Sequence, residues 1–239
     1  MTIFEIPIES KIDWQTALSS SVFSFDVYQT LEYNELFIKQ AVPTLLFFTK
    51  KNYKICFPLL IRNIGNGPYK DVTSVYGYGG LLFNQRNIPI NIKIDFLQEL
   101  TSYFLKKNII SAFSRLHPLI KTSADFPEKM GFIEEINKTV YINLALSDKE
   151  QINQYSHSLR RQLKNMYNSK ITFRIADKSE YLQFMTLYYK TMDRLNADKT
   201  YYFSEDYFKK LVAASGFRTL IIFAEYNDKI IGGDRKSVV

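Results

Sequence analysis

Hydrophobic spacing along the first half of the chain predicts helices alternating with strands. Thr30 can cap a short helix that ends before Pro43, where a strand can begin. Runs of β-prone residues then alternate with one long stretch at helical spacing. In chain order, the predicted elements are a helix over 31–38, a hairpin of strands 44–49 and 53–61, a glycine-interrupted strand over 72–83, a helix over 90–107 and a strand over 109–114.

The second half repeats the theme without detectable internal identity. Ser147 and Glu150 form a capping-box pattern that opens a helix, so we predict a domain boundary there, with domains 1–146 and 147–239. The other predicted elements are a strand over 139–144, a basic helix over 158–167, a strand over 170–176, helices over 178–195 and 204–215, and a hairpin of strands 218–226 and 229–233.

These patterns predict an α/β (α+β) fold with mixed, largely antiparallel sheets, although other folds of that class share them. Hydrophobic residues make up 46% and charged residues 23% of the chain, enough to bury a core. Its apolar runs are far shorter than the about 20 residues of a membrane-spanning helix, and residues 1–10 lack a signal-peptide pattern. We therefore expect a cytoplasmic protein without stable membrane insertion.

The composition makes metal catalysis unexpected and favours anionic partners. Cys56 lies inside an apolar run and is predicted to be a core residue, while His117 and His157 lack the spacing of a metal site. The net charge is +7 and the pI is about 9.2, which favours contact with RNA, nucleotide diphosphates, coenzyme A or lipid phosphates.

The final strand is expected to stop early. A strand starting at Lys229 should continue through several apolar residues, but the sequence changes character at Asp234. Residues 234–239 match the translation of a common sequencing-adapter string. We expect them to be an assembly artefact, the alternative being a natural short tail.

Residues 76–80 are the best candidate for substrate binding. Glycines here permit close approach of a ligand, and the hydroxyls of Tyr76 and Tyr78, beside Gly79, can bind sugar or peptide groups. The alternative is a bulged strand with core tyrosines. Asp71 can bind an acceptor ammonium or remove its proton, or it can stabilise a turn.

Two arginines flank the same predicted sheet. Arg62 and Arg115 can clamp a phosphate or carboxylate, or form structural ion pairs. His117 precedes Pro118, and we interpret it as a loop or packing residue in preference to a general base.

Two further groups are candidates in the second half. Arg160, Arg161 and Lys164 concentrate positive charge on one helical face that can receive phosphates, or that is simply solvated. Tyr201 and Tyr202 can line an acyl or acceptor pocket, or belong to the core.

Several segments together resemble the FemABX-like group of the GNAT superfamily, covering nearly all of the chain to Gly233. They are residues 25–33, 58–62, 71–80, 113–118, 159–165, 184–194 with 201–203, and 224–233. The resemblance implies tandem GNAT-like domains that transfer an acyl group from acyl-CoA, or an aminoacyl group from aminoacyl-tRNA, to an amine in peptidoglycan, polysaccharide or lipid-linked sugar synthesis. The long helical arm of many tRNA-using members is missing here, which favours a small sugar or amine acceptor.

In such enzymes the amine attacks the carbonyl directly, a strand N–H stabilises the oxyanion, and a helix N-terminus holds pyrophosphate. The strand would be the one starting at Lys229, and the phosphate loop after it is absent. We therefore expect the 239-residue chain to be inactive by itself and its full-length parent to be a transferase. The alternative class is a non-catalytic RNA-binding protein using the basic helix and aromatic residues.

Overall fold

The computed structural model describes residues 3–21, 24–120 and 131–239. Contacts between Cα atoms divide the chain into two compact units. The first contains the described residues up to Glu134, with Ala213–Arg218 and Ser237–Val239, and the second contains Glu135–Val212 and Thr219–Lys236. The predicted division at residue 147, and the GNAT-like character of each part, stay predictions.

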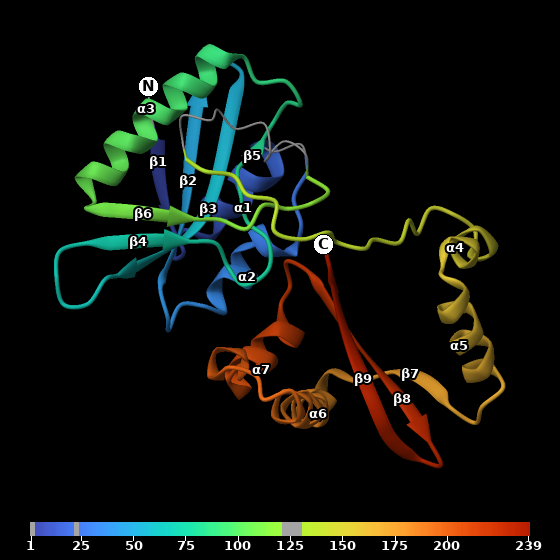
Figure 1. The fold of residues 1–239 in the computed structure, drawn as a ribbon. Coiled ribbons are helices and arrows are strands. Elements are labelled where there is room, and N and C mark those ends of the chain that lie inside the picture. The colour runs from blue at the N-terminus through green and yellow to red at the C-terminus, as the bar shows by residue number, and fades with distance from the viewer. Residues whose placement is uncertain (1–2, 22–23, 121–130) are drawn as a thin grey trace. The chain divides into compact units, whose positions relative to one another are not determined.

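The first unit is built on a mixed sheet with spatial order β1-β2-β3-β4-β6, in which β5 also pairs with β3 (Figure 1). The pair β4–β6 is parallel and the other pairs are antiparallel. The strands are β1 (Ile3–Pro7), β2 (Val42–Lys50), β3 (Tyr53–Asn63), β4 (Lys70–Thr73), β5 (Leu82–Phe83) and β6 (Ile109–Phe113).

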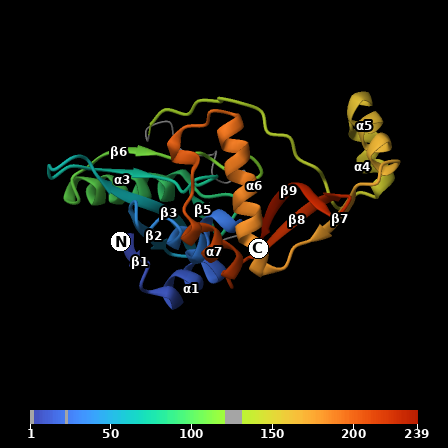
Figure 2. The same ribbon diagram turned by 90° about the horizontal axis from the view of Figure 1, so that it is seen from below.

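Helices cover both faces of this sheet, and α3 and α1 lie on opposite sides of the strands (Figure 2). On one face Ile92, Phe96 and Leu100 of α3 (Ile90–Lys106) pack against a core that includes Leu46 and Ile55. On the other face α1 (Lys11–Ser21), through the fully buried Trp14, packs with Leu45 and Cys56. Alternating apolar side chains of β2 and β3 thus point to opposite faces of the sheet and belong to two separate cores.

The first-half predictions are confirmed except for one strand and for the end of the first predicted helix, which stops at Glu35 and not at residue 38. The hairpin and the long helix agree with prediction to within a few residues, and the Thr30 side chain accepts a hydrogen bond from Tyr33 N at the start of α2 (Leu31–Glu35). The single strand expected over 72–83 is instead two strands, β4 and β5, separated by the glycine-tyrosine segment. Gly77 and Gly80 there adopt positive φ, which a regular strand does not.

The second unit carries a three-stranded sheet, β7-β8-β9, and four α-helices among its described residues. The strands are β7 (Thr172–Ile175), β8 (Arg218–Tyr226) and β9 (Lys229–Val238), the helices are α4 (Asp148–Gln154), α5 (His157–Tyr167), α6 (Tyr181–Arg194) and α7 (Glu205–Ala213), and two 3-10 turns are η4 (Lys178–Glu180) and η5 (Lys199–Tyr201).

Its core lies between α6, α7 and the central strand β8. Phe184 of α6 contacts Phe208 of α7, and both are buried together with Phe223 of β8. Arg174 of β7 donates to both oxygens of Glu180 and to Glu225 Oε1, at 2.7–2.8 Å. This network joins two strands to the turn that starts α6.

Two second-half predictions are wrong. Residues 139–144, expected as a strand, lie outside any strand, and Val140 is 91% exposed. A β-prone sequence forms a strand only where another strand offers backbone partners. The last strand, expected to end at Gly233, runs on to Val238, because a strand depends on backbone pairing more than on apolar side chains. Whether residues 234–239 are an artefact stays a prediction.

The capping box at Ser147 is confirmed, since its side chain and that of Glu150 bind each other's backbone N–H. The predicted fold class is also confirmed: the chain has a mixed α/β fold with largely antiparallel sheets.

Candidate functional site

The predicted site residues fall into separate groups, of which the pair Arg62–Asp71 is the simplest. The two residues face each other across β3 and β4, and the guanidinium binds both carboxylate oxygens, at 2.8 and 2.7 Å. The hydrogen bond to Asp71 raises the pKa of Arg62. This geometry is the structural ion pair that the sequence left open as an alternative for Arg62.

The glycine-tyrosine segment, residues 76–80, follows β4 and is held by its backbone. The Tyr33 hydroxyl donates to Tyr76 O at 2.8 Å, and Gln29 Nε2 donates to Tyr78 O at 3.3 Å. Gly77 has φ of +123°, and a Cβ atom there would lie 2.2 Å from Cε1 of Tyr28. The segment therefore has a defined conformation, with the Tyr76 residue about half exposed.

Gly79 joins this segment to the chain around Arg115. Gly79 N donates to Arg115 O at 2.7 Å, and Arg115 N donates to Ser74 Oγ at 3.3 Å. A Cβ at Gly79 would lie 2.4 Å from Ser74 Cβ and 3.0 Å from Ser114 Oγ. Tyr76, Tyr78, Gly79 and Arg115 are thus brought together, and Arg115 is exposed beside the segment.

His117 and Asp26 form a pair that sequence reasoning missed. His117 Nε2 lies 3.0 Å from Asp26 Oδ2, and Nδ1 accepts hydrogen bonds from Leu119 N and Ile120 N, each at 3.1 Å. An imidazole nitrogen that accepts from amides carries no proton, so the proton is on Nε2 and is donated to Asp26. With both nitrogens engaged, His117 is a structural residue, which confirms the packing interpretation.

Aromatic side chains surround this pair. The Tyr28 ring packs edge-on against Tyr33 and Tyr78, with centroids 5.3 and 5.5 Å apart, and Tyr78 packs against His117 at 5.2 Å. Asp26 and Gln29 also form a capping box around η1 (Val27–Gln29). The spacing of Asp26 and Gln29 is the one sequence signal that could have marked this turn.

The basic helix α5 presents its cations to solvent. Arg160, Arg161 and Lys164 are all exposed, and no ion pair engages them among the residues that the structure describes. The helix itself contains no acidic residue. Such a face can attract phosphate groups.

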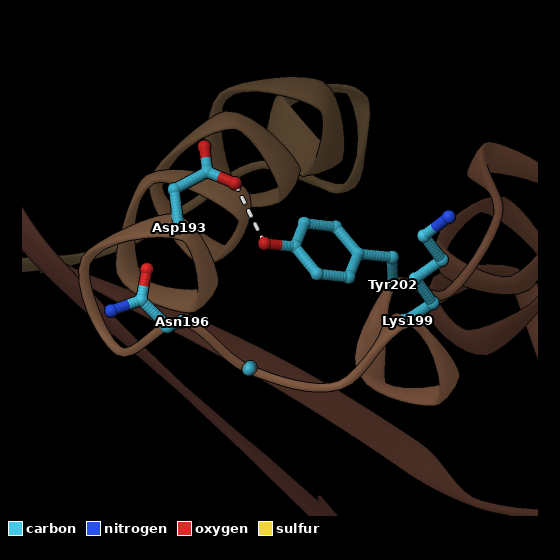
Figure 3. A pocket seen from close by; sticks show the side chains of 5 residues that line it. Asp193, Asn196, Lys199 and Tyr202 are labelled. Atoms are coloured by element: carbon cyan, nitrogen blue, oxygen red, sulfur yellow. Dashed lines mark hydrogen bonds between the residues drawn. The ribbon is translucent and has the colours of Figure 1, made fainter.

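In the second unit, Tyr202 belongs to an open hollow, which is lined by Asp193, Asn196, Ala197, Lys199 and Tyr202 (Figure 3). The Tyr202 hydroxyl donates to Asp193 Oδ1 at 2.7 Å. This bond raises the pKa of Tyr202. Tyr201 is placed next to the hollow but does not line it.

Sequence reasoning assigned no role to Asp193, Asn196 or Lys199. Asp193 lies in the last turn of α6 and Tyr202 follows η5, and no periodic pattern connects the end of a helix to the turn after it. Their proximity is a product of the chain reversal between these elements.

Two features are absent from the described ranges 3–21, 24–120 and 131–239. Among these residues no group of three or more His, Cys, Asp or Glu side chains is arranged to hold a metal ion. No helix in the same ranges has the length and apolar character to cross a membrane.

Comparison with known proteins finds a solved structure with a similar fold but no match to the sequence. The chain has a mixed α/β fold of the FemX type. The crystal structure of FemX matches 94% of this chain with a TM-score of 0.60 and 14% sequence identity. The chain spans 57% of the length of the FemX chain. No protein family matches the sequence, and no curated protein does.

Proposed function

We propose that the whole protein to which this chain belongs transfers an acyl or aminoacyl group to an amine during peptidoglycan or polysaccharide synthesis. The observation that carries the proposal is the FemX-type fold over 94% of the chain. Several segments of the sequence resemble FemABX-like transferases in the same order along the chain, which supports the proposal. The donor is acyl-CoA or aminoacyl-tRNA, the reaction needs no metal, and the location is the cytoplasm.

The transfer is a direct substitution at a carbonyl carbon. The acceptor nitrogen forms the new C–N bond, the thioester C–S or ester C–O bond breaks, and the thiolate or alkoxide leaves as the nitrogen loses a proton. A neutral amine is required, so a base must take that proton. Asp71 is the proposed base, and it can act only if Arg62 releases one of its oxygens.

Substrate binding is assigned to Arg62, to the glycine-tyrosine segment with Arg115, and to Tyr201 and Tyr202. The segment offers ordered backbone and a half-exposed Tyr76 ring, and the exposed Arg115 guanidinium suits a phosphate or carboxylate of the acceptor. The cations of α5 are assigned to the donor, since coenzyme A and tRNA both carry phosphates.

The test compares the 239-residue chain with the whole protein recovered from the gene. Each is incubated with labelled acetyl-CoA or aminoacyl-tRNA and a panel of amines, and labelled amide is measured. We expect transfer by the whole protein and none by the 239-residue chain. Equal rates would refute the expectation that the 239-residue chain is inactive by itself.

The RNA-binding alternative has its own signature in the same preparation. If the whole protein binds RNA with an affinity that falls steeply with salt, and transfers no group from any donor, RNA binding would replace the transferase proposal.

Replacing Arg160, Arg161 and Lys164 together by glutamine should raise the KM for the donor, while Lys149→Gln on the neighbouring helix should leave it unchanged.

A further inference from the structure

The chain around the hollow of Figure 3 is held rigidly by three tyrosine hydroxyls. Tyr188 OH donates to Tyr201 O at 2.6 Å, Tyr189 OH donates to Phe203 O, and Tyr202 OH donates to Asp193 Oδ1. Each bond connects α6 to the last residue of η5 or to the two residues that follow it. Side chains fixed in this way bind a ligand without first losing conformational freedom.

The other edge of the hollow is fixed by the end of α6. Asn196 adopts φ of +48°, Asn196 N donates to Asp193 O, and Ala197 N donates to Met192 O. These paired bonds form the tight helix ending in which asparagine tolerates the left-handed conformation. Asp193 and Asn196 are therefore held on one compact turn.

The polar groups of the hollow have capacity left for a ligand. Tyr202 engages only one oxygen of Asp193, and among the described residues no hydrogen bond or ion pair engages the Asn196 amide group or the Lys199 ammonium. A carboxylate in this lining selects a cation or a hydroxyl donor, and the amide can both donate and accept.

The openness of the hollow makes it unsuited to an acyl chain. An acyl chain needs an enclosed apolar cavity, whereas this hollow is open and has one anion and one cation in its wall. A sugar instead presents hydroxyls to polar groups and C–H faces to an aromatic ring such as that of Tyr202. The Tyr202 ring extends toward Asp193 in Figure 3, so an aromatic ring and a carboxylate lie side by side in the hollow.

We propose that this hollow binds an amino sugar, with the sugar ammonium on Asp193, ring hydroxyls on Asn196 and Lys199, and the ring against Tyr202. The assignment of this sugar as the acceptor rests on the proposed function, but its binding does not. An open hollow suits the terminal residue of a larger molecule, whose remaining part stays in solvent.

Binding is measured on the 239-residue chain by saturation-transfer NMR titration with glucosamine, N-acetylglucosamine and glucose at pH 6.5. We expect glucosamine to bind at least about fivefold more tightly than the other two, since only it carries the cation. Asp193→Asn should weaken glucosamine binding about tenfold and abolish that preference. Tyr202→Ala should weaken all three sugars.

Asp228→Asn, in the exposed turn between β8 and β9, is the matched control for loss of one carboxylate and should leave binding unchanged. Amide proton spectra of each variant verify that the second unit is folded. Equal binding of glucosamine and glucose, or tighter binding of lysine amide than of glucosamine, would overturn the inference.

These outcomes are separable from those of the transfer assay. Transfer by the whole protein without sugar binding here would leave the proposed function standing and remove this site. Selective glucosamine binding with no transfer to any amine would leave this site standing and refute the proposed function.

Discussion

Gly77 lies so close to the Tyr28 ring that a Cβ atom at this position would sit 2.2 Å from Cε1 of Tyr28. The backbone there also has φ of +123°, which side chains rarely adopt. Tyr28 in turn packs against Tyr33, whose hydroxyl holds the Tyr76 carbonyl. The contact therefore connects the conformation of the glycine-tyrosine segment to the packing of the first unit.

Gly77→Ala should destabilise the first unit by about 3 kcal/mol, through backbone strain and displacement of the Tyr28 ring. Urea unfolding followed by Trp14 fluorescence measures this, because Trp14 is the only tryptophan of the chain and is buried in the first unit. Gly67→Ala is the control, since its Cβ would meet only Ile64 O at 4.0 Å, and it should change stability by less than about 1 kcal/mol. Similar losses in both variants would contradict the assigned role of Gly77.

His117→Ala should lower the free energy of unfolding by about 2 to 3 kcal/mol, because it removes the hydrogen bond to Asp26 Oδ2 and the acceptor of two backbone amides. His117→Asn can keep an acceptor near the Nδ1 position, and His117→Gln can keep a donor near the Nε2 position. Each should recover part of the loss in the same fluorescence assay. If all three variants are as stable as the parent, the pair does not hold the loop.

Cys56 should make the stability of the first unit fall in alkaline solution. Burial raises the pKa of its thiol to about 12, well above the roughly 8.5 of an unfolded cysteine. The stabilising contribution is fully present below the unfolded pKa and is lost as pH rises toward 12, since only the unfolded thiol ionises. Between pH 8.5 and 10 the unfolding free energy should fall by about 2 kcal/mol more in the parent than in Cys56→Ala.

Measuring both proteins at each pH removes the contribution of the lysines and tyrosines that titrate in the same range. Parallel pH profiles would contradict a buried, protonated Cys56. A thiol reagent gives a second check, because the native protein should react slowly at pH 8 and the unfolded protein rapidly.

Arg62 and Asp71 should contribute little to stability. Their side chains are 48% and 23% exposed, and exposed ion pairs contribute at most about 1 kcal/mol. A double-mutant cycle of Arg62→Ala and Asp71→Ala should give a coupling energy below about 1 kcal/mol. A larger coupling would mean that the pair is less solvated than its exposure indicates.

The same pair separates a structural role from a catalytic one in the whole protein. If Asp71 is the base, Asp71→Asn should lower the transfer rate about 100-fold or more while stability changes little. An unchanged rate would assign Asp71 to the ion pair alone.

The sequence predicted those features that depend on neighbours along the chain. Hydrophobic periodicity identified β2, β3 and α3, and local polar side chains marked the starts of α2 and α4 at Thr30 and Ser147. These signals are reliable because a cap or a helical face is made by residues within a few positions of each other. The prediction failed at residues 139–144, where the run had strand character but no partner strand.

The candidate sites were predicted only in part, because residue type does not show which side chains meet in space. Residue type alone marked Tyr76, Tyr78, Arg62 and Asp71 as polar or aromatic groups of interest, but it could not tell that Arg62 occupies both oxygens of Asp71.

Local sequence by itself thus determined the β2–β3 hairpin, helix α3, the caps at Thr30 and Ser147 and the basic face of α5. Tertiary structure alone decided that His117 meets Asp26 across 91 positions, that Tyr28 closes over Gly77, and that Tyr202 reaches Asp193. The physical reason is that such contacts form only when chain reversals and sheet pairing bring distant segments together, and no residue in either segment encodes its partner's position.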